Sequence, residues 1–295
     1  MIIKDFLSTT SALIRGSFRV LFANEPLRMA GATPFFSTFP PPPMLIIIVR
    51  VLGLVIDRRA LGRGIMEKLA NTVGEEGSGQ VLASVRGFRS LQQSGWVSLL
   101  IFIFFLFVAT TLFIVIQSSL NQIWQLKKGQ SKKVREILRP RLHSLAVILA
   151  TGVLFMAVLV LDGAQALVGG YINQLAPDFA TYVNSALNHV LSVLIVTVWF
   201  FVLFMYLPDG RPPWTDAFAG ALVTSVLFTV GKLVLRILLL ESNIAQLYGT
   251  AGSLVLLLLF VFYSSLILYF GAAFTRVWCH HRGHTIRPLY NATQV

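Results

Sequence analysis

Two long apolar runs near the end of the chain, within residues 217–278, restrict the fold more than any other feature. A short polar link, residues 241–250, joins them, and Gly249 and Gly252 permit a tight reversal of the backbone there. Each run exceeds the roughly 20 apolar residues that an α-helix needs to cross about 30 Å of hydrocarbon. The sequence therefore predicts a transmembrane helical hairpin.

The composition extends this prediction to the whole chain. Of the 295 residues, 56% are hydrophobic and only 12% are charged, which is too little polar surface for a soluble domain. The length suits about six spans with short loops, so we expect an all-α, polytopic membrane helical bundle. The single cysteine, Cys279, excludes an internal disulfide and a cysteine cluster for metal.

The apolar runs also place the other spans. Besides the hairpin, we predict spans at residues 31–56, 96–123, 142–168 and 186–207. The six-helix transmembrane domain then covers residues 31–278, with a cytoplasmic tail at residues 279–295. Residues 57–95 are too polar to span and are predicted to form two short amphipathic helical pieces around a glycine-containing turn.

Residues 1–30 are expected to form an N-terminal amphipathic segment on the cytoplasmic face. Apolar side chains fall at helical spacing on one side, and Arg15 and Arg19 lie on another; the apolar set is Leu13, Ile14, Phe18, Leu21 and Phe22. Two interpretations stay open. The helix either lies in the membrane interface or packs as an ordinary helix on the bundle.

Basic residues set the predicted orientation. Residues 127–141 hold one acid, Glu136, and a dense group of cations, namely Lys127, Lys128, Lys132, Lys133, Arg135, Arg139 and Arg141. Such a cluster is typical of a cytoplasmic loop. No lysine or arginine occurs in residues 142–210, so the linker that contains Asp178 is expected outside. Six spans with both termini in the cytoplasm satisfy this asymmetry except in residues 57–95, where six cations are partly balanced by four acids.

Six short motifs occupy the second half of the chain. They are Tyr206-Leu207-Pro208-Asp209, Trp214-Thr215-Asp216, Gly220-Ala221-Leu222, Gly231-Lys232, Tyr248-Gly249-Thr250-Ala251-Gly252-Ser253 and Gly271-Ala272-Ala273-Phe274-Thr275. This series resembles the YihY/BrkB family of bacterial inner-membrane proteins, with one departure: Ala273 stands where the family has an acid. The resemblance covers nearly the whole chain and implies six transmembrane helices in the inner membrane. It implies no established activity, and an older ribonuclease label of the family finds no support in these residues.

Four consecutive prolines, Pro40 to Pro43, interrupt the first predicted span. Proline removes an amide donor and cannot continue an α-helix, so the span must break there. Broken backbone at membrane depth is tolerated where it lines a cavity, which would mark a pathway. Alternatively, the prolines lie at the inner boundary and the helix starts at Met44.

Signatures of an enzyme or a cofactor site are missing from the sequence. Gly231-Lys232 is followed by Leu233 and forms no phosphate-binding loop, and neither HExxH nor GxSxG occurs. The metal-capable residues Cys279, His280, His281 and His284 follow the last span, but a flexible basic tail is the better interpretation of them. We therefore predict no catalytic residue, no metal and no cofactor.

The candidate binding site is a group of ionisable residues inside apolar runs, namely Lys232, Arg236, Arg50 and Asp162. Ionisable groups within a span are costly and mark functional sites. At about 1.5 Å per residue, Lys232 lies about 24 Å from Asp216, in the outer half of the bilayer. These residues form either an outward-facing cationic cavity for an anion or a structural Lys232–Asp162 pair, with the arginines extending to the interface.

Three classes of function follow, in this order. The first is an inner-membrane transporter or exporter of an anionic, envelope-related solute or lipid, and its partners are anionic phospholipids or phosphorylated head groups. The second is a non-transporting membrane scaffold, and the third is an enzyme. The net charge of +12 does not indicate nucleic acid, because the cations flank apolar runs, where they meet anionic lipid. A homo-oligomer is compatible with the sequence.

Overall fold

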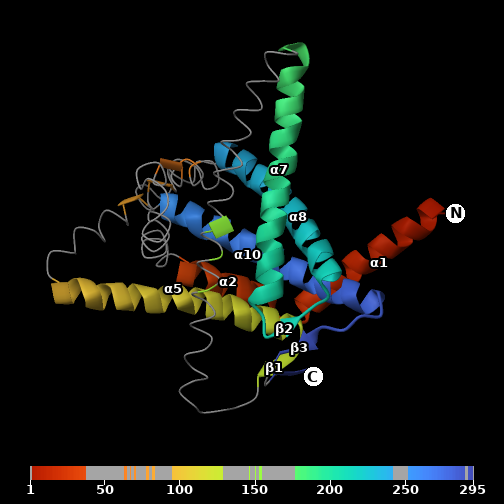
Figure 1. The fold of residues 1–295 in the computed structure, drawn as a ribbon, viewed down its shortest axis with the longest axis horizontal. Helices are drawn as coiled ribbons and strands as arrows, with labels where there is room; N and C mark the ends of the chain where they lie inside the picture. The colour runs from red at the N-terminus through yellow and green to blue at the C-terminus, as the bar shows by residue number, and fades with distance from the viewer. Residues whose placement is uncertain are drawn as a thin grey trace.

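The computed structural model describes residues 2–37, 95–128, 177–241, 252–289 and 292–294, together with isolated positions within residues 63–83 and 146–154. These residues form long α-helices and two small two-stranded sheets (Figure 1). Several predicted features lie outside the described residues: the prolines at 40–43, Arg50, Asp162, Tyr248 and Gly249.

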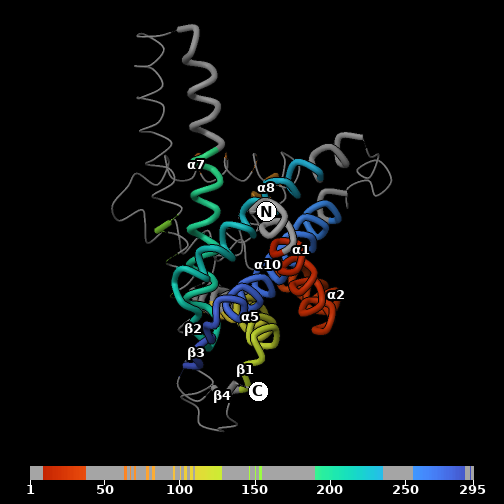
Figure 2. Tube along the Cα trace, turned by 90° about the vertical axis from the view of Figure 1, so that its right-hand side faces the viewer, coloured from red at the N-terminus to blue at the C-terminus, as the bar shows by residue number. Residues whose placement is uncertain are grey.

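The helices are α1 (Ile2–Phe22), α2 (Pro26–Ser37), α5 (Gly95–Ile123), α7 (Pro177–Tyr206), α8 (Trp214–Glu241) and α10 (Gly252–His281). The strands are β1 (Leu126–Lys128), β2 (Gly210–Arg211), β3 (Arg287–Pro288) and β4 (Ala292–Gln294). Helix α10 packs against α8 on one side and against α1 and α2 on another, while α7 packs on α8 (Figure 2).

The two helices of the predicted hairpin have the properties of membrane spans. Trp214–Val234 and Val255–His281 have mean hydropathies of 1.8 and 2.3, yet only 28% of each apolar window is buried in the protein. The exposed side of α8 is a continuous apolar stripe, with Phe218, Leu222, Val226 and Val230 at 40–52% exposure. The core helix of a soluble protein would bury such a stripe, so lipid is its natural neighbour. Within the described residues these are the two candidate spans; the count of six stays a prediction.

Helix α7 begins earlier than the sequence predicts. The sequence predicts a span at residues 186–207 and an external linker that holds Asp178, whereas α7 starts at Pro177 and includes Asp178 in its first turn. The linker assignment is therefore wrong. Proline is favoured at the first helical position and an acid in the first turn interacts well with the helix dipole, so this boundary has a local cause.

Helices α8 and α10 lie antiparallel and touch through a reciprocal pair of glycines and threonines. A Cβ on Gly220 would overlap the side chain of Thr275, and a Cβ on Gly271 would overlap that of Thr224. Each threonine hydroxyl donates to the carbonyl oxygen four residues earlier in its own helix: Thr224 to Gly220 at 2.6 Å and Thr275 to Gly271 at 2.8 Å. Both hydroxyls are thereby satisfied, and the two backbones come close.

The apolar residues of α1 divide between two environments. Leu13 and Leu21 are buried, and a Cβ on Gly16 would lie 3.2 Å from Val277 of α10. Phe18 and Phe22 are 46% and 66% exposed. The predicted single apolar face is therefore two adjacent stripes. One is buried on the bundle and the other is largely exposed, although the Phe18 ring also contacts Phe270 of α10 at 4.8 Å between centroids.

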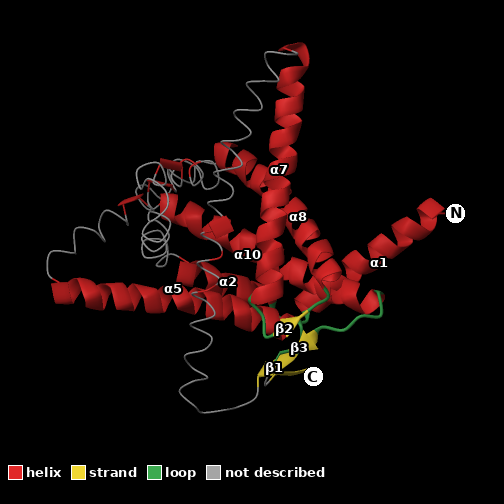
Figure 3. Cartoon of the chain, in the orientation of Figure 1, coloured by secondary structure: helices red, strands yellow, loops and turns green. Residues whose placement is uncertain are grey.

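The C-terminal residues fold back onto the bundle. β3 pairs with β2 and β4 pairs with β1, both antiparallel, so the tail adds a strand to the residues after α5 and to the turn between α7 and α8 (Figure 3). The prediction of a flexible tail is wrong. Ile286, 3% exposed, lies against Gly210 and anchors the tail by apolar contact.

Substituting the interface glycines tests the α8–α10 contact. We expect Gly220→Ala or Gly271→Ala to lower the melting temperature in detergent, since a methyl group there overpacks the contact at a cost of about 1–3 kcal/mol. Gly31→Ala is the matched control, because no atom lies within 4 Å of its Cβ position in helix α2. There alanine should be neutral or stabilising through its higher helix propensity. Equal melting of the three variants would contradict the proposed close contact.

Candidate functional site

Lys232 lies on the inward side of α8. Phe228, four residues earlier and thus on the same helical face, makes edge-on ring contacts with Phe200 of α7 at 5.9 Å and Phe260 of α10 at 6.2 Å between centroids. Lys232 itself is partly buried, whereas the next two residues, Leu233 and Val234, are 52% and 50% exposed. The apolar side of α8 thus faces outward, and Lys232 shares the helical face of Phe228, which packs on α7 and α10.

Helices α8 and α10 come into close contact at Gly231, the residue before this lysine. A Cβ on Gly231 would lie 2.9 Å from Ile267 Cδ1 and 3.0 Å from Tyr263 Cε2, so glycine lets the ring of Tyr263 lie against the α8 backbone. The ring of Tyr263 also meets Phe260 edge-on, with 5.4 Å between centroids. The Tyr263 hydroxyl is buried and has no hydrogen-bond partner among the described residues.

The other predicted site residues are only partly placed. Arg236 follows Lys232 by one helical turn of α8, and its side chain is not described. Gly252 and Ser253 begin α10, and Gly271 belongs to the α8–α10 contact. Arg50 and Asp162 lie outside the described residues, so the predicted group of four stays a prediction.

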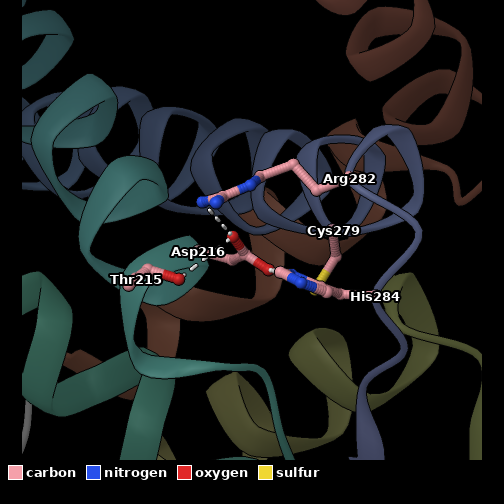
Figure 4. A network of polar contacts seen from close by, with 5 residues as sticks. All are labelled: Thr215, Asp216, Cys279, Arg282 and His284. Carbon is pink, nitrogen blue, oxygen red and sulfur yellow. Dashed lines mark hydrogen bonds and ion pairs between the residues drawn. The ribbon is translucent and has the colours of Figure 1, made fainter.

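A second polar site, which the sequence analysis did not propose, surrounds Asp216 in the first turn of α8 (Figure 4). Asp216 is fully buried, and its carboxylate accepts hydrogen bonds from Arg282 Nη1 at 3.3 Å and Cys279 Sγ at 3.3 Å. His284 Nδ1 lies 2.7 Å from the same carboxylate. A buried carboxylate is stable only when such donors replace its water.

Two of the metal-capable residues, Cys279 and His284, have a different role in the structure. Cys279 and His284 meet at the carboxylate of Asp216, where their polar atoms take part in hydrogen bonds. Across the ranges that the structure describes, no group of His, Cys, Asp and Glu is arranged to hold a metal ion. The signal for Asp216 was present in the Trp214-Thr215-Asp216 motif, but spacing alone did not connect it to residues 279–284.

Asp209 joins the same end of the bundle to α5. Its carboxylate accepts from Asn121 Nδ2 at 2.8 Å and from Gln117 Nε2 at 3.3 Å, and its backbone amide donates to Asn121 Oδ1 at 2.9 Å. The amide of Leu289 in the tail donates to the Asp209 carbonyl at 2.8 Å. The motif that ends in Asp209 therefore holds α5, the α7–α8 turn and the tail together.

Arg276 of α10 caps the C-terminal end of α5. Its guanidinium donates to the carbonyl of Ile123 at 2.7 Å and to Gln125 Oε1 at 2.6 Å. A cation is favourable there because the last carbonyls of a helix lack partners and carry partial negative charge. The indole of Trp124 donates in turn to the carbonyl of Ala272 at 2.9 Å. We call this region, with Asp209, Asp216 and the four strands, the strand end.

Removing the charge of Asp216 tests the strand end. We expect Asp216→Asn to destabilise the protein by about 2 kcal/mol, because hydrogen bonds to charged groups contribute about 1.5–3 kcal/mol and the half-exposed partners reduce that value. Glu25→Gln is the control: Glu25 and Arg28 pair at 2.6 Å, but both side chains are 67% exposed. Its effect should stay below about 0.5 kcal/mol. Similar melting of both variants in detergent would show that the Asp216 cluster does not stabilise the fold.

The relatives that match this chain are named membrane proteins. The chain is 32% identical over 174 residues to UPF0761 membrane protein Ent638_4092 of Enterobacter sp. (strain 638), covering 57% of this chain and 54% of that protein. It is 31% identical over 173 residues to UPF0761 membrane protein YihY of Salmonella typhimurium, with the same 57% and 54% coverage, so it spans about half the length of these curated relatives. No solved structure matches the chain. The model of the family described as virulence factor BrkB matches residues 18–293, nearly the whole sequence, and the chain therefore belongs to this family.

Proposed function

We propose that this protein is a multi-pass protein of the bacterial inner membrane that binds and moves an anionic, envelope-related solute or lipid. Lys232 is the principal contact for the anion, and Arg236, Arg50 and Asp162 complete the polar site. The observation that carries this proposal is the inward position of Lys232 on a helix whose other side is continuously apolar.

The energetic argument rests on the cost of a cation inside a span. A lysine at membrane depth is expensive, by about 3 kcal/mol on insertion scales, and such residues face the bundle interior and mark substrate pathways. Lys232 lies about 24 Å along α8 from Asp216 at the usual helical rise, far from the hydrogen-bonded strand end. An anion that approaches from the opposite end of α8 reaches this cation without passing the strand end.

The N-terminal helix supports a membrane with anionic lipid as the partner. Arg15 and Arg19 are exposed on α1, beside the exposed stripe of Ile14, Phe18 and Phe22. Cations next to exposed aromatic side chains are typical of helices that lie in the interface of an anionic membrane. We propose this position for the outward stripe of α1, on the cytoplasmic side.

A non-transporting scaffold is the alternative, and a specific observation favours it. The described polar contacts at the strand end, around Asp209, Asp216 and Arg276, all join structural elements to one another. If Lys232 pairs with Asp162 in the same manner, the polar residues of the spans serve packing alone. We propose no enzymatic reaction and no cofactor.

Topology is the first test of the proposal. Reporter fusions at Lys132 and after Arg282 should report the cytoplasm, and fusions near Gln246 should report the outside, because the dense cations of residues 127–141 remain in the cytoplasm. A fusion within the first turn of α7, near Asp178, should also be external. Cytoplasmic signal at Gln246 would contradict the proposed orientation and with it the outward-facing position of Lys232.

Substitution of the lysine separates carrier from scaffold. We expect Lys232→Gln to accumulate as folded protein and melt near the wild-type temperature in detergent, yet to lose the stabilisation given by phosphatidylglycerol. A ligand that binds only the folded state raises its stability, and the loss of that increase reports the loss of binding. Lys232→Arg should retain part of it, because the charge remains.

The scaffold makes the opposite prediction for the same variants. Removing one partner of a buried Lys232–Asp162 pair strands the other charge and destabilises the fold, whereas removing both costs much less. Loss of folded Lys232→Gln protein, rescued by the double variant with Asp162→Asn, would therefore reject the carrier in favour of the scaffold.

A further inference from the structure

We infer that Tyr263 belongs to the anion site and that its hydroxyl donates a hydrogen bond to the phosphate or carboxylate group that Lys232 attracts. This inference rests on the proposed function and adds a residue from a second helix, which no sequence motif indicates. It makes the proposed site one that α8 and α10 share.

The register of the two helices places both groups at one level. Gly220 lies against Thr275 and Thr224 against Gly271, and the same antiparallel register sets residue 232 of α8 opposite residue 263 of α10. The contact of the Tyr263 ring with Gly231 agrees with this register, since it joins the neighbouring position of α8 at 3.0 Å. The lysine and the tyrosine therefore lie at the same depth between α8 and α10.

The surroundings of the tyrosine explain why its hydroxyl needs a ligand. The ring packs against Phe260 and the α8 backbone, and the hydroxyl is buried with no partner in the described part of the chain. A buried hydroxyl without a hydrogen bond is unfavourable, so the site gains free energy when an acceptor arrives. An anionic oxygen held beside Lys232 is such an acceptor, and a hydroxyl bond to a charged oxygen is short and strong.

Tyr269, further along α10, is a suitable comparison for Tyr263. Tyr269 is fully buried, and its hydroxyl lies 2.8 Å from Thr33 Oγ1 of α2, so its hydrogen bond is made within the protein. One helix thus carries two buried tyrosine hydroxyls, of which one is paired and the other is not. The phenylalanine variant of each tyrosine removes the hydroxyl oxygen, which within the described residues is hydrogen-bonded in one case and unbonded in the other.

The experiment compares Tyr263→Phe, Tyr269→Phe and Lys232→Gln in detergent, with the melting temperature and ligand binding as readouts. The probes are mixed micelles with phosphatidylglycerol or phosphatidylcholine, and soluble glycerol 3-phosphate. We expect Tyr263→Phe to melt at or above the wild-type temperature without ligand, because it deletes an unsatisfied group. Its apparent affinity for phosphatidylglycerol should fall about tenfold, since a hydrogen bond to a charged group contributes about 1.5 kcal/mol or more.

The control should show the reverse pattern. Tyr269→Phe loses a hydrogen bond made within the fold, so its melting temperature should fall while its phosphatidylglycerol affinity stays at the wild-type value. Glycerol 3-phosphate separates the two sources of the anion. If glycerol 3-phosphate raises the melting temperature of the wild-type protein, the site accepts a free phosphate ester. If only phosphatidylglycerol raises it, the site requires the lipid. Both results support an anion site.

The remaining outcomes overturn the inference. If Lys232→Gln loses phosphatidylglycerol binding and Tyr263→Phe keeps it, the tyrosine is not part of the site, although the proposed function stands. If Tyr263→Phe lowers the melting temperature without ligand as much as Tyr269→Phe, its hydroxyl has a structural partner and the inference fails. If neither Lys232→Gln nor Tyr263→Phe changes binding, both the inference and the proposed function are wrong.

Discussion

The close antiparallel contact of α8 and α10 is the constraint on which the rest of the described structure depends. In a membrane, apolar side chains gain little free energy by exchanging contacts with lipid for contacts with one another. Helices therefore associate through dispersion contacts at short range. Gly220 and Gly271 allow that short range, and Thr224 and Thr275 fill the space that the missing side chains leave. Because α1, α2 and α7 pack on these two helices, their positions follow from this contact.

Polar groups complete the bundle where the helices end. A helix end leaves carbonyl and amide groups without partners, and the strand end satisfies several of them with side chains from distant parts of the sequence. Arg276 serves the end of α5, and Asp216 collects donors that follow α10. The described protein thus has an apolar outer stripe along α8 and a dense hydrogen-bonded network at one end. Lys232 and Tyr263 lie away from that network, within the apolar part.

Hydropathy predicted most of the described helices because membrane helices are long and their signal is additive over many residues. The predicted hairpin at 217–278 corresponds to α8 and α10, and the span at 96–123 to α5. The start of α7 was missed because its first turns are polar, and the local preference of Pro177 and Asp178 for a helix start determines it.

The candidate site was less predictable, since contacts between helices depend on register. The sequence identified Lys232 by its charge, but Tyr263 is an ordinary aromatic residue in an apolar run until the register places it beside Gly231. The Asp216 cluster was missed for a related reason. Asp216 lies more than sixty residues from its partners along the chain, and only the folding back of the tail brings His284 to it.

The pairing of the tail with two earlier segments has a consequence for the order of assembly. β1 follows α5, but its partner β4 is synthesised after α10, and β2 likewise waits for β3. A chain that enters the membrane during synthesis folds from its N-terminal side, so all the described helices are in place before either sheet exists. The sheets therefore form after these helices and join segments from distant parts of the sequence.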